Sequence, residues 1–232
     1  MEALFDIVFP PACLACDAVL PGSAFYCEAC APLVEETPAP RCERCGEPGR
    51  FPSGACPRCT ARPPDFHAAY APFEHAGALA RAIHRFKYED HPELARPLAA
   101  LVAQAAGDAL DALPGALVPV PLHQVRFRER RFDQATLLAV ELAKALGRPL
   151  EDTWLTRTRA TTRQVGLTDT AREANVAGAF AATAHAHRAQ VVLVDDVFTT
   201  GATARAAARA LLDAGAAQVS VLCVARAFRS GD

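Results

Sequence analysis

Residues 191–203 read VVLVDDVFTTGAT, and this stretch decides the fold of the chain. Its first four residues form an uninterrupted apolar run, which is typical of a strand buried on both faces of a parallel sheet. Two carboxylates, Asp195 and Asp196, follow directly, and then come small and hydroxyl-bearing residues. Residues 204–214 are rich in alanine, arginine and leucine, so we expect a helix there. The stretch therefore predicts a strand, an acidic pair, a loop and a helix, in that order.

The loop at residues 199–203 has the composition of a phosphate-binding site. Amides at the start of a helix lack intrahelical partners and lie at the positive end of the helix dipole, so they attract anions. Threonine hydroxyls add donors, and Gly201 lets the backbone approach a ligand closely. The acids would lie at the carboxyl end of the strand, where open α/β sheets bind ligands. The alternative is a strand–turn–helix unit with a solvated acidic end. A Walker A loop is excluded, because no Gly-Lys-Ser/Thr is present.

Composition limits the function classes. A length of 232 residues fits one α/β domain plus a small accessory module, and 51% apolar residues are enough for a sizeable core. A net charge of −2 gives no global basic field that would indicate nucleic acid as a partner. No segment reaches the ~20 apolar residues of a membrane span, and the acidic N-terminus does not have the pattern of a signal peptide. We therefore expect a cytoplasmic protein without a membrane span.

Eight of the nine cysteines form four C-x-x-C pairs that repeat with a period of 29 residues. Each pair supplies two thiolates on one turn, and tetrahedral zinc takes four. We expect two structural Zn²⁺ ions in a double zinc ribbon, with the ligands Cys13, Cys16, Cys27, Cys30, Cys42, Cys45, Cys56 and Cys59. A redox dithiol is the rival interpretation of a single pair, but four pairs at matched spacing disfavour it.

Two pairings of the cysteines are compatible with this spacing. Sequential sites would use residues 13–30 and 42–59, whereas a cross-braced arrangement would join the first pair to the third and the second to the fourth. Equal spacing within each half favours the sequential form. The ninth cysteine, Cys223, falls in an apolar run and is expected in the core.

The proline-containing stretch at residues 60–65 predicts a linker, which divides the chain into a zinc ribbon at 1–65 and an α/β domain at 66–232. Within the second part, apolar periodicity predicts helices at 77–88, from 92 onward and at 132–146. Short apolar runs predict strands at 67–73, 117–121, 154–159 and 219–224. The polar residues 160–170 predict a loop. Alternation of helices and strands indicates a parallel sheet.

The motif at 191–203 resembles the site at which type I phosphoribosyltransferases bind 5-phosphoribosyl 1-pyrophosphate (PRPP). The wider pattern resembles the ComF family, a competence-associated branch of these proteins with an N-terminal zinc ribbon. The similarity covers the block VPVPLH at 118–123 with Arg126 and the run RRFDQ at 130–134, and it extends to Arg157, Arg159, Thr162, Gln164, Leu167, Arg172, Asn175, Ala179 and Phe180. The chain departs from the family at Arg131, where the family has glycine, and at Asp133, where it has asparagine.

The resemblance implies a type I phosphoribosyltransferase fold and a set of site residues. Asp195 and Asp196 are the expected catalytic pair and would hydrogen-bond the ribose hydroxyls, directly or through water on Mg²⁺. The 5-phosphate would lie on the loop around Val197, Phe198, Thr199, Thr200, Gly201, Ala202 and Thr203. Groups expected to meet the pyrophosphate or close over it are Leu122, His123, Arg126, Arg163, Gln164 and Lys87.

Three functions fit these features. The first is a Mg²⁺-dependent phosphoribosyltransferase that binds PRPP and acts in DNA uptake, natural transformation or DNA processing. Thr199 replaces the acid of purine-salvage relatives, so hypoxanthine and guanine are disfavoured as acceptors. The second is a PRPP or nucleotide sensor that does no chemistry. The third is a module that binds single-stranded DNA through the ribbon and the arginines of 126–131, with competence and recombination proteins as further partners.

Overall fold

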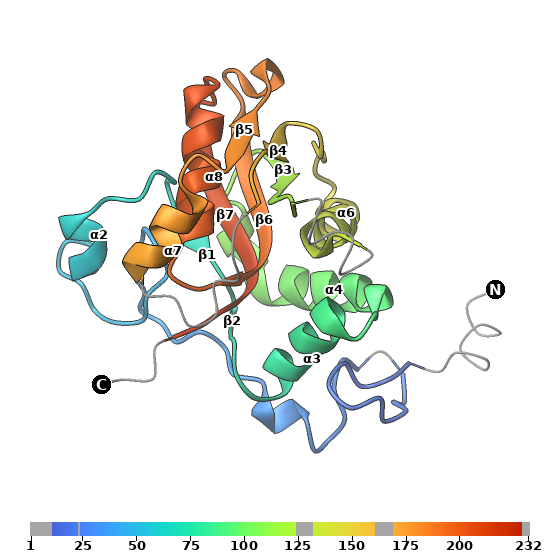
Figure 1. Cartoon of the computed structure of the whole chain (residues 1–232). Coiled ribbons are helices and arrows are strands. Elements are labelled where there is room, and N and C mark those ends of the chain that lie inside the picture. Colours follow the sequence, from blue (N-terminus) through green and yellow to red (C-terminus); the bar gives the residue numbers. More distant parts are fainter. Residues whose placement is uncertain (1–10, 23, 124–131, 161–168, 229–232) are drawn as a thin grey trace.

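A parallel sheet lies at the centre of the computed structural model, which describes residues 11–22, 24–123, 132–160 and 169–228. Its strands follow the order β1-β7-β6-β3, and β2 also pairs with β7 (Figure 1). The strands are β1 (Ala69–Tyr70), β2 (Phe73–Glu74), β3 (Ala116–Pro119), β6 (Gln190–Phe198) and β7 (Gln218–Arg226). All their pairings are parallel, as the alternation of elements predicts.

The edge strand next to β7 is divided into two short strands. β1 pairs with Val221 and Leu222 of β7, and β2 pairs with Ala225 and Arg226. Pro72 lies between the two and has no N–H to donate to the ladder, so pairing stops there and resumes one residue later. The single strand expected at 67–73 is therefore wrong in its continuity but right in its place.

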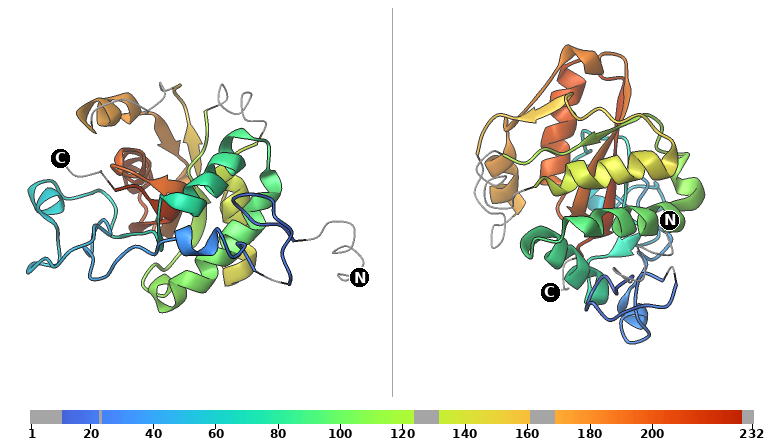
Figure 2. Two further views of the ribbon diagram at one scale, coloured as in Figure 1. Left: turned by 90° about the horizontal axis from the view of Figure 1, so that it is seen from below. Right: turned by 90° about the vertical axis from the view of Figure 1, so that its right-hand side faces the viewer.

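Helices cover both faces of the sheet. The α-helices are α2 (Pro57–Ala61), α3 (Gly77–Tyr88), α4 (Ala95–Ala106), α6 (Gln134–Leu146), α7 (Asp169–Val176) and α8 (Ala202–Asp213). Short 3₁₀ turns are η1 (Ala31–Leu33), η2 (Pro92–Leu94), η3 (Gly107–Leu110) and η4 (Ala184–Ala186). A separate antiparallel pair, β4 (Leu155–Arg157) and β5 (Phe180–Ala182), packs near α8. Figure 2 shows α8 on one side of the sheet and α3, α4 and α6 on the other.

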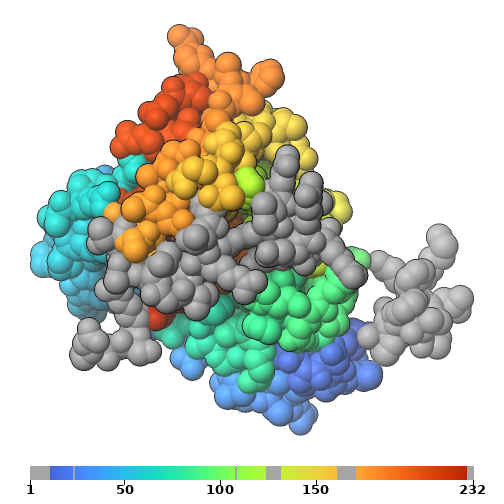
Figure 3. All heavy atoms as spheres, viewed as in Figure 1, coloured from blue at the N-terminus to red at the C-terminus, as the bar shows by residue number. Residues whose placement is uncertain are grey.

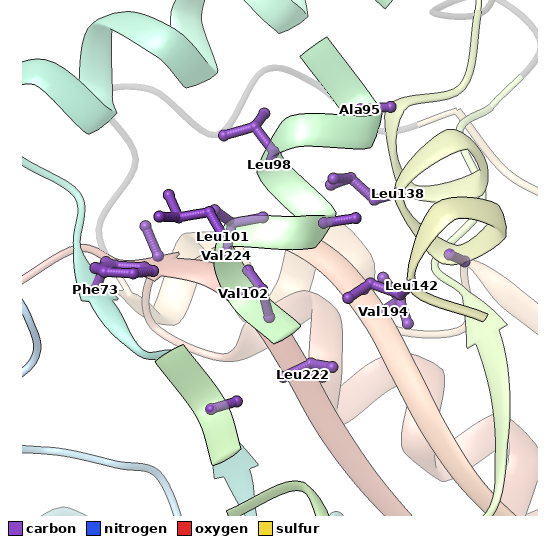
Figure 4. Close-up of a cluster of buried hydrophobic side chains, with 14 of the residues drawn as sticks. Phe73, Ala95, Leu98, Leu101, Val102, Leu138, Leu142, Val194, Leu222 and Val224 are labelled. Carbon is purple, nitrogen blue, oxygen red and sulfur yellow. The ribbon is translucent and has the colours of Figure 1, made fainter. Parts of the chain in front are cut away.

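The core divides according to the alternation of side chains along β6. Val192 and Val194 pack with the helices α3, α4 and α6, as Figure 4 shows for Val194, Leu98 and Leu142. Val191 and Leu193 face the opposite way, toward α8. Both sets are almost fully buried, which explains why the strand is apolar without interruption.

The two halves of the cysteine-rich module dock on different parts of the domain. The first half packs against α3, where the buried Arg85 donates to the Leu14 carbonyl at 2.8 Å and pairs with Asp17 at 2.5 Å. The second half shares a core with α8 and the sheet. Figure 3 shows the first half (blue) beneath α3 and the second (cyan) on the flank next to α7 and α8.

The segment expected to act as a linker is held in place. Arg205 of α8 donates to the carbonyls of Pro63 and Arg62 at 3.0 and 3.2 Å, and Arg209 pairs with Asp65. The first residues of the expected linker belong to α2. Among the described residues, no helix combines the length and apolar character that a membrane span requires.

Candidate functional site

The site begins where β6 extends beyond the end of its neighbour β3. β3 pairs with β6 only from Ala116 to Pro119, whereas β6 continues along β7 to Phe198. The last backbone hydrogen bond from this segment to β6 runs from the Val120 amide to the Val194 carbonyl at 2.9 Å, and pairing stops there because the next amide on that side, of Leu122, donates to the Asp133 carboxylate instead. Asp195 and Asp196 therefore lie beside the gap left by β3, at the carboxyl end of β6 as the sequence suggested, although the strand continues through them to Phe198.

A cleft of about 860 Å³ opens at this edge. Carboxyl ends of β3 and β6, the start of α8, the start of α6 and the C-terminal half of α3 contribute to it. The residues that line it are His75, His84, Lys87, Tyr88, Asp90, Val120, Pro121, Leu122, Asp133, Gln134, Ala135, Arg157, Asp195, Asp196, Val197, Phe198, Thr199, Gly201, Thr203, Ala204, Val221 and Cys223. Its position at the carboxyl ends of parallel strands is the usual place for a ligand in an open α/β sheet.

The surroundings of the acidic pair strongly perturb the pKa of Asp195. Lys87 Nζ lies 2.7 Å from Asp196 Oδ1, and both side chains are largely buried. Burial raises the pKa of the Asp195 carboxyl to about 7; the charge of Asp196 adds to the rise and Lys87 opposes it. A carboxyl group with a perturbed pKa in a cleft is typical of a functional site.

The loop after β6 forms the start of α8. Gly201 is the N-cap residue and has a left-handed backbone with φ of 79°, which glycine adopts without strain. The Thr200 hydroxyl accepts a hydrogen bond from the Ala202 amide at 3.3 Å. Thr199, Gly201 and Thr203 line the cleft. The loop and the start of this 12-residue helix therefore border the cleft, which is the position that an anion site at a helix N-terminus requires.

Asp133 connects the two segments that form the other wall of the cleft, the loop after β3 and the start of α6. One carboxylate oxygen caps α6 by accepting from the Thr136 amide at 3.2 Å, and the other accepts from the Leu122 amide at 2.7 Å. Burial raises the pKa of Asp133, and the two amide donors oppose that rise. The family asparagine has a single acceptor oxygen at this position, whereas Asp133 has one oxygen for each of the two amide donors.

The structure brings together most of the expected site residues that it describes. Asp195, Asp196, Val197, Phe198, Thr199, Gly201, Thr203, Leu122 and Lys87 all line the cleft. Ala202 is buried at the start of α8, and His123 is half-buried one residue after Leu122. Arg126, Arg163 and Gln164 fall outside the described residues.

Sequence reasoning missed His75, which lines the cleft next to the acids. It follows β2 directly, and its amide donates to the Arg226 carbonyl at 2.7 Å. Burial lowers the pKa of the imidazole, and the nearby Lys87 charge adds to that effect. The available signal was its position: a polar residue at the carboxyl end of a strand that belongs to the same sheet as β6.

The eight paired cysteines form two clusters with the geometry of tetrahedral zinc sites. Sulfur atoms of Cys13, Cys16, Cys27 and Cys30 lie within 4.8 Å of one another, and so do those of Cys42, Cys45, Cys56 and Cys59. The grouping is sequential and not cross-braced. Neighbouring sulfurs lie 3.7 Å apart in both clusters, between Cys16 and Cys27 and between Cys45 and Cys56. Zn–S bonds of ~2.3 Å in a tetrahedron place sulfurs about 3.8 Å apart, so the residues fit the metal.

Comparison with known families gives two matches along the chain. Residues 4–63 match the model of the double zinc ribbon domain, and residues 133–230 match that of the phosphoribosyl transferase domain. The fold class expected from the sequence is thus confirmed: helices flank a parallel sheet, and a double zinc ribbon precedes it.

Curated proteins are similar to this chain, two of those named here over most of their length. The DNA utilization protein YhgH of Salmonella typhimurium is 34% identical over 225 residues, which cover 95% of this chain and 99% of that protein. Competence protein F of Haemophilus influenzae is 30% identical over 208 residues, covering 87% of this chain and 90% of that protein. Competence protein ComFC of Bacillus subtilis is 35% identical over 116 residues, 47% of this chain and 44% of that protein.

Proposed function

Because this chain belongs to the ComF family, with a double zinc ribbon and a phosphoribosyltransferase domain, we propose that it binds PRPP with Mg²⁺ in the cleft at the end of β6 and transfers its phosphoribosyl group. The observation that carries the proposal is the convergence on one cleft of two carboxylates, a lysine and the N-terminus of α8. These groups match a ligand with a phosphate at one end, hydroxyls in the middle and a pyrophosphate at the other.

Each part of the cleft has a role in this proposal. The amides and hydroxyls of residues 199–203 hold the 5-phosphate. Asp195 and Asp196 accept hydrogen bonds from the ribose hydroxyls, and Lys87 then turns from Asp196 to the pyrophosphate. We assign the backbone at Leu122 and His123 to the pyrophosphate, and Arg126, Arg163 and Gln164 remain predicted contacts.

The acidic pair also fits magnesium, a hard cation that prefers carboxylate and water oxygens and keeps most of its waters. Bound there with PRPP, the ion supplies charge neutralisation for the pyrophosphate. In the transfer itself, the bond from the anomeric carbon to pyrophosphate breaks and its electron pair leaves with the pyrophosphate. A bond from the acceptor to the same carbon forms. The protein contributes by holding both ends of PRPP and stabilising the departing charge.

Calorimetry with PRPP tests the binding step. We expect saturable binding in the presence of Mg²⁺ and much weaker binding of ribose 5-phosphate, which lacks the pyrophosphate that Lys87 and the metal neutralise. Pyrophosphate release across a panel of acceptors then separates a transferase from a sensor, because a sensor binds PRPP and releases nothing. Absence of PRPP binding with Mg²⁺ would contradict the proposal in both forms.

The pH dependence of PRPP binding reports on Asp195. Hydroxyl donors favour the ionised carboxylate, whereas the free site holds the pKa of Asp195 at about 7, so binding expels a proton. Affinity should therefore rise from pH 6 to pH 8 and level off above that range. The Asp195→Asn variant should lose this dependence apart from the titration of the PRPP phosphates. Calorimetry of both chains in matched buffers measures it, and identical pH profiles would refute the role of Asp195.

The names of the relatives, which refer to DNA utilization and competence, support a role in DNA uptake or processing, and single-stranded DNA is a second candidate ligand. The basic side chains of the second ribbon are partly engaged within the chain. Arg44 donates to the His67 carbonyl at 3.1 Å, Arg41 lies over the Tyr70 ring, and Arg58 approaches Cys45 Sγ at 3.8 Å. A salt series with a single-stranded oligonucleotide tests this candidate, because phosphate contacts release counterions and make binding steeply salt-dependent.

A further inference from the structure

Arg226, the last residue of β7, is a buried cation that contacts the second zinc site directly. It is only 3% exposed. Its guanidinium donates to the Cys45 carbonyl and to the Glu47 carboxylate, and Nη2 lies 3.9 Å from Cys45 Sγ. Four thiolates on one Zn²⁺ carry a net charge of −2, so a guanidinium next to one of them is favourably placed.

The same guanidinium also contacts the end of β6. Arg226 Cζ, the central carbon of the guanidinium, lies 4.9 Å from the centroid of the Phe198 ring, which is a cation–π contact. Phe198 is 4% exposed and packs edge-to-face on Phe66, with ring centroids 5.9 Å apart. The backbones agree with this arrangement, since Phe198 pairs with Arg226 in the sheet and accepts a hydrogen bond from the Ala227 amide at 2.9 Å.

Phe198 in turn supports the loop that begins α8. A Cβ built on Gly201 would lie 2.8 Å from the tip of the Phe198 ring, so the ring packs directly against the glycine that caps the helix. Gly201 is buried, and the amides that follow it are those assigned above to the 5-phosphate. A movement of the ring would therefore change the position of the loop, because packed interiors leave little free space.

We propose that Arg226 is a positioning residue that couples the second zinc site to the anion loop at residues 199–203 through the ring of Phe198. The Cys45 carbonyl and the Glu47 carboxylate fix the position of the guanidinium. The guanidinium packs on the Phe198 ring, and the ring packs against Gly201. The identity of the ligand rests on the proposed function, whereas the coupling itself does not. If the turn with Cys45 and Glu47 were displaced, the buried guanidinium of Arg226 would lose these hydrogen-bond partners. This is strongly unfavourable, so we expect the contacts to act as a unit.

Amide hydrogen exchange on the zinc-loaded, ligand-free chain tests the coupling. Arg226→Met removes the charge and the donors but keeps an unbranched side chain. The expected result is unchanged zinc content, exchange at residues 199–204 that is roughly tenfold faster, and PRPP affinity that is lower by a similar factor, within the usual range of coupling between sites. Arg226→Lys, which keeps the charge, should recover part of both losses.

The matched control is Arg209→Met, which removes an exposed arginine of α8 that pairs with Asp65 and has no contact with the loop in the described structure. It should leave zinc content, loop exchange and PRPP affinity unchanged. If Arg226→Met does not fold, Phe198→Leu replaces it, because this variant keeps the contacts of Arg226 with Cys45 and Glu47 but shrinks the ring. It should also accelerate loop exchange while retaining both zinc ions.

Loop exchange equal to that of the native chain, in a folded Arg226→Met or Phe198→Leu variant with full zinc, would overturn the coupling. Failure of the proposed function gives a different result. In that case the native chain does not bind PRPP, but the change in loop exchange still follows the Arg226 and Phe198 variants.

Discussion

A chain in which Asp195 and Asp196 are both replaced by asparagine is expected to bind PRPP with Mg²⁺ at least about 100-fold more weakly than the native chain. The estimate follows because a hydrogen bond to a charged group contributes about 1.5–3 kcal/mol, and two are lost together with their attraction for the metal. Calorimetry of both chains measures the effect.

The fold should survive this change. Burial disfavours the charge of Asp195, so an amide there costs little, and the thermal midpoint reports any loss from the broken contact between Asp196 and Lys87. Asp213→Asn, an exposed change at the other end of α8, is the matched control and should bind PRPP as the native chain does. A double variant that is folded and retains native affinity would remove the acidic pair from the site.

Cys45→Ser is expected to cause the largest loss of stability. It removes one ligand of the second zinc site, and a structural zinc contributes roughly 10–16 kcal/mol of apparent binding free energy in small zinc-dependent peptides. The damage should extend into the domain, because this cluster shares a core with α8, Phe198 and the sheet. The thermal midpoint should fall by roughly 10 °C or more, since each kcal/mol corresponds to about 2–4 °C in a chain of this size.

Zinc content and thermal unfolding measured together check this result. The native chain should hold two zinc ions and the variant one. Cys223→Ala is the control, because this buried cysteine of β7 belongs to neither cluster and its replacement should leave both zinc ions in place. If Cys45→Ser kept two zinc ions and the native midpoint, the second cluster would not be a structural zinc site.

The central strand, the acidic pair, the loop and the helix after it could be predicted from sequence, because apolar continuity, charge and turn chemistry all lie within residues 191–213. Helix α3 was predicted with its observed bounds, since its apolar residues recur at helical spacing and Gly77 marks its start. The zinc ligands could also be predicted from sequence, because the C-x-x-C spacing alone indicates a zinc site.

Other features depend on contacts between distant residues. The pairing of Lys87 with Asp196 joins residues of α3 and β6, and no local pattern encodes it. Helix α7 was missed because the polar residues around 160–170 hide its start, and its one fully buried apolar residue, Val176, comes at its end. Residues 60–65 were interpreted as a spacer, because the arginines of α8 that hold them lie about 140 positions away.

The most direct test of the account is a titration of the isotope-labelled chain with PRPP and Mg²⁺, followed through backbone amide shifts. We predict saturable shifts in residues 195–204, at the end of β6 and the start of α8, together with Leu122 across the cleft. The same titration with Mg²⁺ alone should leave residues 199–203 largely unmoved. Saturable shifts confined to other parts of the chain, or no saturable shift at all, would contradict the claim that this cleft holds PRPP.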